Sequence, residues 1–218
     1  MIKKGDLEMD RNRDKIPNKN NSDLSNITQK WVEVLAPFTR DYPLKLSASE
    51  LARETGIPQQ TASRYLDMLS KRGLIEYERR GKNKLFYLDL KKQTTKIVLS
   101  IVENQKALHL LSNSEISIIL NEILGECDSV IVFGSYSTTR FDKESDLDLV
   151  IFECRNKNKI KKIKDRVNIE INEHYITYTG FKKILSLGNA LAIEISRSHI
   201  MFGQIPKLIE ILSGGKIG

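Results

Sequence analysis

Apolar residues between positions 27 and 73 recur at the three- and four-residue spacing of amphipathic helices. The first group predicts a leading helix and contains Ile27, Trp31, Val34, Leu35 and Phe38. Ser47 and Glu50 form a capping-box pattern that begins a second helix, and Gly56 ends it. A third helix follows between Pro58 and Gly73. Two short helices joined by so tight a turn predict a helix-turn-helix unit.

The third helix has one apolar face, formed by Ala62, Leu66 and Leu69, that must pack inward. Its other side presents polar residues near the N-terminal end, namely Gln59, Gln60, Ser63 and Arg64. The next segment alternates apolar and polar residues around a turn at residues 81–83, which predicts a β-hairpin. Its tip gathers the cations of Arg79, Arg80, Lys82 and Lys84. These charges repel one another unless a polyanion lies nearby.

Residues 27–95 resemble the winged helix-turn-helix domains of bacterial and archaeal transcription regulators, from the leading helix through to the basic wing. The resemblance implies that Gln59, Gln60, Ser63 and Arg64 read base edges in a major groove. It also implies that Arg79, Arg80, Lys82 and Lys84 meet phosphates or the minor groove. Winged helices also serve as protein–protein modules, so the resemblance alone leaves both functions open.

The charge distribution bears on that choice. Residues 1–95 hold 19 Lys and Arg against 13 Asp and Glu, and so carry +6 of the formal charge of +7. A surplus of this size can serve solubility alone. Its concentration in the first half nevertheless predicts an anionic partner there, and double-stranded DNA is the partner we expect.

Residues 96–112 predict a connector helix. Its apolar stripe consists of Ile97, Ile101, Leu108 and Leu111 and is interrupted by Asn104. Two interpretations of this stripe remain open. The helix packs against the chain's own domains, or it forms the seam of a homodimer, which would suit paired DNA half-sites.

A second set of patterns lies between residues 130 and 152. The apolar run Val130–Phe133 predicts a buried strand that ends at Gly134. Asp146 and Asp148 enter another apolar run, and because side chains alternate along a strand, both carboxylates point to the same face. Two carboxylates so close repel unless a cation joins them. Mg²⁺ is the cation that oxygen ligands favour, with a phosphate chain completing its coordination and backbone amides after Gly134 as a second cradle.

The order Gly134-Ser135, the ten residues 136–145 and Asp146-Leu147-Asp148 resembles the nucleotidyltransferase superfamily related to DNA polymerase beta, in particular its minimal branch. The resemblance covers residues 113–218, and the whole chain looks like archaeal-type proteins that fuse a winged helix to such a domain. It implies that Gly134, Ser135 and Ser145 bind nucleotide phosphates. In an active member it implies two Mg²⁺ ions held by three carboxylates.

The third carboxylate is expected on the next strand. Alternation there places Asn168, Glu170 and Asn172 on one face, so Glu170 is the candidate, ahead of Glu173. The predicted catalytic and metal-binding residues are therefore Asp146, Asp148 and Glu170. Two positions depart from the family pattern: Glu170 stands where Asp is usual, and Thr139 stands where Gly is usual.

Composition narrows the class of protein in which these patterns occur. With 218 residues of which 40% are hydrophobic, the chain is globular, and its two cysteines exclude a disulfide framework or a cysteine-rich zinc site. No apolar run approaches the ~20 residues of a membrane helix. We therefore expect a cytoplasmic protein with no membrane partner.

The sequence predicts an α+β fold in four parts. These are a mobile tail (1–25), a winged helix-turn-helix domain (26–95), the connector helix (96–112) and a nucleotidyltransferase-like domain with a small mixed β-sheet flanked by helices (113–218). The leading functional hypothesis is a DNA-binding transcriptional regulator whose second domain binds a nucleoside triphosphate with Mg²⁺. The alternative is an active nucleotidyltransferase that moves a nucleoside monophosphate to a protein, RNA or small-molecule acceptor, including an antitoxin-like role.

Overall fold

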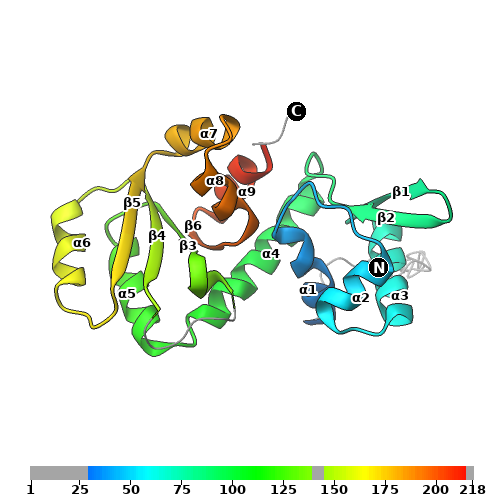
Figure 1. Ribbon diagram of the computed structural model, residues 1–218, viewed down its shortest axis with the longest axis horizontal. Coiled ribbons are helices and arrows are strands. Elements are labelled where there is room, and N and C mark those ends of the chain that lie inside the picture. Colours follow the sequence, from blue (N-terminus) through cyan, green and yellow to red (C-terminus); the bar gives the residue numbers. More distant parts are fainter. Residues whose placement is uncertain (1–28, 139–144, 215–218) are drawn as a thin grey trace, which may run out of the picture.

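The computed structural model describes residues 29–138 and 145–214. Two lobes lie side by side, and the long helix α4 (Gln93–Leu110) runs diagonally between them (Figure 1). The predicted tail over residues 1–25 and the departure at Thr139 lie outside the described residues. Within the described ranges, none of the helices combines the length and apolar character that crossing a membrane requires.

The N-terminal lobe is a winged helix. It contains α1 (Gln29–Leu35), the 3₁₀ turn η1 (Ala36–Thr39), α2 (Ala48–Thr55), α3 (Gln59–Lys71) and the hairpin β1 (Glu76–Arg80) and β2 (Asn83–Tyr87). The predicted capping box is present, because the Ser47 side chain accepts from the Glu50 amide and the Glu50 carboxylate accepts from the Ser47 amide. Gly56 ends α2 with a left-handed φ of 71°. Ala62, Leu66 and Leu69 of α3 are fully buried, as their spacing predicts.

Helix α4 packs against the chain through a different face from the predicted stripe. Val98, Leu99 and Val102 are buried. Ile97, Ile101 and Leu108, which share the opposite stripe, are instead 54%, 39% and 61% exposed. The interpretation that this stripe packs against the chain's own domains is therefore wrong for these three residues.

The C-terminal lobe is built around a four-stranded mixed sheet with the order β5-β4-β3-β6. The strands are β3 (Ser129–Phe133), β4 (Leu147–Phe152), β5 (Ile171–Ile176) and β6 (Ile200–Gly203). β4 pairs in parallel with β5, whereas β3 pairs antiparallel with both β4 and β6. The remaining elements are α5 (Ser114–Leu124), the 3₁₀ turn η2 (Gly134–Ser137), α6 (Lys157–Lys164), α7 (Tyr178–Ser186), α8 (Ala190–Arg197) and α9 (Ile205–Gly214).

The two faces of the sheet belong to two apolar cores. Val132, Leu149 and Ile151 on one face pack with residues of α5 and α6. Val150 and Phe152 on the other face belong to a cluster that continues through α4 and α7–α9 into the winged helix. Because residues two apart share a face, Asp148 lies on this second face, toward the side that joins the two lobes.

Candidate functional site

The first candidate site lies where β3 ends and β4 begins. Phe133 stands opposite Asp148 in the antiparallel register, and Gly134 follows with a left-handed φ of 66°. A Cβ atom at Gly134 would lie 2.3 Å from Asp148 Oδ2 and 3.2 Å from its Cγ. Both the backbone conformation and this close approach require glycine. The glycine of the Gly-Ser pattern thus makes room for the second aspartate of the Asp-x-Asp pattern.

Asn172 of β5 completes the contacts of the aspartate pair. It stands opposite Asp148 in the parallel register of β4 and β5. Its Nδ2 donates to Asp148 Oδ1 at 3.2 Å and to Asp146 Oδ2 at 3.4 Å. The amide therefore joins the two carboxylates and offsets part of their repulsion, which is the effect that a cation would have.

Glu170 and Glu173 are placed differently. Glu170 comes just before β5, where its backbone carbonyl accepts from the Leu147 amide at 2.8 Å and its side chain is exposed. Glu173 forms an ion pair with Lys164. Among residues 29–138 and 145–214, no three His, Cys, Asp or Glu side chains are grouped so that they could hold a metal ion. The role of Glu170 as a third ligand thus remains a prediction, and Asn172 is the residue that sequence reasoning missed.

The residues predicted to hold Mg²⁺ supply few oxygen donors. Asp146 is exposed and Asp148 half-buried, so both carboxylates, which are hard oxygen ligands, reach solvent where β4 begins. A cavity of about 440 Å³ opens beside Asn172 and Glu170, on the side of Lys164 and Asp165. Two-metal chemistry needs ions about 3.5–4 Å apart, held by shared ligands. Among the described residues, two carboxylates meet here with the Nδ2 group of Asn172, which is a donor and not an oxygen ligand, so a third acidic ligand for such a pair of ions is not grouped with them.

The turn after Gly134 is held by its own hydroxyl groups. The Ser137 hydroxyl donates to the Gly134 carbonyl at 2.8 Å, and the Thr138 hydroxyl donates to the Ser135 carbonyl at 2.9 Å. Ser135 is half-buried in this turn, and Ser145 directly precedes Asp146 at the start of β4. The structure thus brings the predicted phosphate-binding residues to the same end of the two strands as the aspartates.

A second candidate site is the outer face of α3. Gln59, Gln60 and Arg64 are exposed and Ser63 is half-buried, so all four reach solvent. The Arg64 guanidinium lies over the Tyr65 ring, 5.5 Å from its centroid. The helix therefore presents donors and acceptors of the kind that read base edges.

The hairpin next to α3 carries cations of two kinds. Arg79, Arg80 and Lys82 are exposed and form no ion pair within the part of the chain that the structure describes. Lys84 instead donates to Asp67 Oδ1 at 2.6 Å and lies over the Tyr77 ring. Lys84 thus fastens the hairpin to α3, and three cations are left facing outward.

These two sites agree with the comparisons to protein families. A winged helix with an exposed polar helix, and a strand pair that unites Gly-Ser with Asp-x-Asp, define a regulator-type domain followed by a nucleotidyltransferase-type domain. Residues 27–84 match the MarR family, and residues 113–200 match the nucleotidyltransferase domain. The chain therefore combines a MarR-family winged helix domain with a nucleotidyltransferase domain, which confirms the predicted order of a winged helix and a nucleotidyltransferase domain. No curated protein and no solved structure matches the chain.

Proposed function

We propose that the protein is a DNA-binding transcriptional regulator whose nucleotidyltransferase domain binds a nucleoside triphosphate with Mg²⁺ and does not transfer it. The observation that carries this proposal is the position of Asn172. It stands beside Asp146 and Asp148, where a third carboxylate on β5 would complete an acidic site. An amide there supports binding of one ion and weakens the case for two.

The DNA-binding part of the proposal rests on α3 and the wing. Gln59, Gln60, Ser63 and Arg64 would read the bases, and Arg79, Arg80 and Lys82 would neutralise phosphates. Each neutralised phosphate releases counterions, so affinity should fall steeply as salt rises. Lys84 contributes less, because Asp67 already neutralises it.

The nucleotide-binding part rests on the Gly134 turn and the aspartates. When bound, Mg²⁺ would supply charge neutralisation between the carboxylates and the phosphate chain. Asp146 and Asp148 would hold the ion, and Ser135 and Ser145 would hydrogen-bond to phosphate oxygens. Asn172 would orient Asp148 through the hydrogen bond that it already makes.

An active nucleotidyltransferase is the second candidate. The observation that favours it is the intact aspartate pair where β4 begins, with Asp146 exposed and Asp148 half-buried. In that case a protein, RNA or small-molecule acceptor would receive a nucleoside monophosphate, and Glu170 would serve as the third carboxylate.

We also propose a homodimer formed through α4. Ile97, Ile101 and Leu108 lie within one narrow stripe of this helix, and each is more than a third exposed. A second copy of the chain would cover this stripe and place two α3 helices on paired half-sites.

Two equilibrium titrations test the proposed function. A mixed-sequence duplex should bind at low salt, and binding should weaken steeply as salt rises. Nucleoside triphosphates should bind with Mg²⁺ to the wild type and lose affinity in Asp148→Asn. Failure of the duplex to bind at any salt concentration would contradict the proposed DNA-binding function. Equal nucleotide affinity in the wild type and in Asp148→Asn would contradict the proposed nucleotide site.

A further inference from the structure

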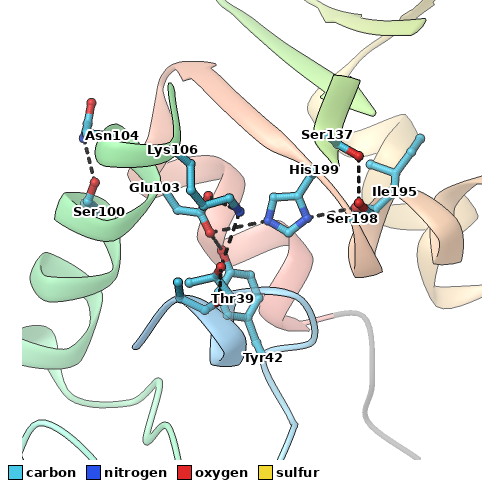
Figure 2. A network of polar contacts seen from close by, with 11 residues as sticks. Thr39, Tyr42, Ser100, Glu103, Asn104, Lys106, Ser137, Ile195, Ser198 and His199 are labelled. Atoms are coloured by element: carbon cyan, nitrogen blue, oxygen red, sulfur yellow. Dashed lines mark hydrogen bonds and ion pairs between the residues drawn. The ribbon is translucent and has the colours of Figure 1, made fainter. Parts of the chain in front are cut away.

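A buried polar network joins the two lobes (Figure 2). Its centre is Glu103 of α4, which is fully buried. Tyr42, from the segment that follows η1, donates its hydroxyl to Glu103 Oε1 at 3.1 Å. His199, between α8 and β6, is equally buried, and its Nε2 lies 3.5 Å from the same oxygen. Glu103 therefore contacts the winged helix on one side and the nucleotidyltransferase domain on the other.

The charges facing Glu103 come from its own helix and from the second lobe. Lys106 Nζ lies 2.9 Å from Glu103 Oε2 and also donates to the Thr39 hydroxyl at 3.3 Å. Burial raises the pKa of Glu103, but the charges of Lys106 and His199 outweigh this effect and lower it to about 2. Glu103 is therefore a carboxylate at neutral pH. Removing a partner from a buried ion is costly, so these contacts hold α4, the segment with Tyr42 and the segment with His199 in one arrangement.

From His199 the contacts continue to the Gly134 turn. The Ser198 hydroxyl forms a hydrogen bond of 2.7 Å with the Ser137 hydroxyl of η2 (Figure 2). Ser137 in turn donates to the Gly134 carbonyl. His199 Nδ1 lies 2.9 Å from the Ile195 carbonyl of α8, which holds the ring in place. A series of contacts thus runs from the proposed phosphate-binding turn through Ser198 and its chain neighbour His199 to Glu103 and Tyr42 of the winged helix side.

One contact in this series is incomplete. Within the part of the chain that the structure describes, His199 Nε2 has no hydrogen bond of ordinary length, and its ion-pair contact with Glu103 Oε1 is 3.5 Å long. A buried polar atom without a partner is costly. A movement of the segment that carries Ser198 and His199 would change this distance, which makes it the adjustable contact of the network.

We infer that Ser198 and His199 are positioning residues that couple occupancy of the Gly134 turn to DNA binding by the winged helix. This inference rests on the proposed function, since it assigns the regulation of that same nucleotide site. A ligand shifts a conformational equilibrium only through a difference in its affinity for the two states. Phosphates on the turn would displace Ser137, and Ser198 would pass the displacement to His199, Glu103 and Tyr42. Coupling of this kind is reciprocal, so DNA would change nucleotide affinity by the same factor.

The experiment measures the Kd of the full chain for a mixed-sequence duplex, with and without a saturating mixture of ribonucleoside triphosphates and Mg²⁺. In the wild type we expect the nucleotides to change the duplex Kd by about fivefold or more. Ser198→Ala should bring that factor close to one while each ligand alone keeps its affinity. Ser198→Thr, which retains a hydroxyl, should restore it.

Two further variants complete the design. Ser196→Ala is the matched control, because among the described residues the Ser196 hydroxyl donates to the Ile193 carbonyl of its own helix alone, and the variant should leave the coupling intact. Glu103→Gln should also abolish the coupling, provided that its circular dichroism spectrum matches the wild type. The inference is overturned if both ligands bind and the wild-type Kd does not change, or if Ser198→Ala keeps the full effect. Absence of binding by either ligand alone would instead reject the proposed function itself.

Discussion

Asn172 lies opposite Asp148 in adjacent parallel strands, and its side-chain amide donates to the Asp148 carboxylate at 3.2 Å. The same amide reaches Asp146 Oδ2 at 3.4 Å. An uncharged donor thus occupies the position from which a third acidic side chain would face the pair. Because the amide carries no charge, the negative charge of this site comes from Asp146 and Asp148, and a bound cation would have to neutralise these two carboxylates.

Replacing Asn172 by Asp should convert the site into a stronger metal site. The new carboxylate would add a third negative charge, so Mg²⁺ affinity should rise by about tenfold. Without Mg²⁺ the variant should lose roughly 1–3 kcal/mol of stability, because two hydrogen bonds to charged groups become repulsive contacts. Calorimetric titration and chemical unfolding measure the two effects.

Asn168→Asp is the control for that variant. It adds the same charge just before β5, outside the contacts of the aspartate pair. Equal Mg²⁺ affinity in Asn172→Asp and Asn168→Asp would show that position 172 has no special relation to the ion.

Gly134→Ala should disrupt the site through a collision. Its Cβ would lie 2.3 Å from Asp148 Oδ2, and the left-handed φ costs a further 1–2 kcal/mol, roughly, for any other residue. We expect loss of Mg²⁺–nucleotide binding in addition to the lower stability. Gly188→Ala has a similar φ of 74° but open space around its Cβ, so it should lose stability alone. If both variants bind nucleotide equally well, the Gly134–Asp148 contact does not support the site.

Wing cations should differ in their contribution to DNA binding. Arg79→Ala removes an exposed cation that forms no ion pair with the described residues, so the slope of log K against log salt should shrink by about 1. Lys84→Ala removes the residue across the hairpin from Arg79, whose charge Asp67 already neutralises, and should change the slope much less. Duplex binding by fluorescence anisotropy at several salt concentrations measures both. An equal loss of slope in the two variants would contradict the prediction that Arg79 contributes more to DNA binding than Lys84.

Glu103 should make stability depend on acid pH. Its pKa in the folded chain is about 2, below the ordinary value of 4.5. The carboxylate therefore stabilises the folded state fully above about pH 4.5, and this contribution, on the order of 3 kcal/mol, is lost as the pH falls toward 2. In Glu103→Gln the stability deficit relative to the wild type should be large at about pH 6 and smaller at about pH 3.

Urea unfolding at the two pH values measures that deficit. Glu115→Gln, at an exposed position on α5, should show little deficit at either pH. A deficit of Glu103→Gln that stays constant with pH would show that the charge of Glu103 does not hold the lobes together.

The exposed stripe of α4 predicts the oligomeric state. Ile101→Asp with Leu108→Asp should convert a dimer into a monomer, because two charges would be buried in the seam. Leu187→Asp, at a residue that is 73% exposed at the end of α7, should leave the dimer unchanged. Sedimentation equilibrium distinguishes these outcomes, and a monomeric wild type would reject the seam.

Local patterns predicted the elements of both lobes well. The capping box at Ser47 and Glu50, the glycine that ends α2 and the hairpin turn at Gly81 are all present. Each depends on residues that are neighbours in sequence, and their geometry is set by local hydrogen bonds and allowed φ values. Alternation also placed Asn172 on the face of the aspartates, although a search for acids passed over an amide.

Contacts between residues far apart in the sequence could not be predicted from local patterns. The charge of a glutamate favours exposure to solvent, yet Glu103 is buried, and Tyr42 and His199, far away in sequence, contact it there. On α4, the residues Val98, Leu99 and Val102 face the core in place of the more regular stripe. Which face of a helix is buried depends on how the lobes dock, and no single helix contains that information.

The fate of a bound triphosphate distinguishes the regulator from the transferase. The full chain, incubated with Mg²⁺, labelled nucleoside triphosphates and candidate protein, RNA and small-molecule acceptors, should bind the triphosphate and return it intact. Release of pyrophosphate with transfer of label, lost in Asp148→Asn, would contradict the proposal that Asn172 leaves this domain able to bind a nucleotide and unable to transfer it.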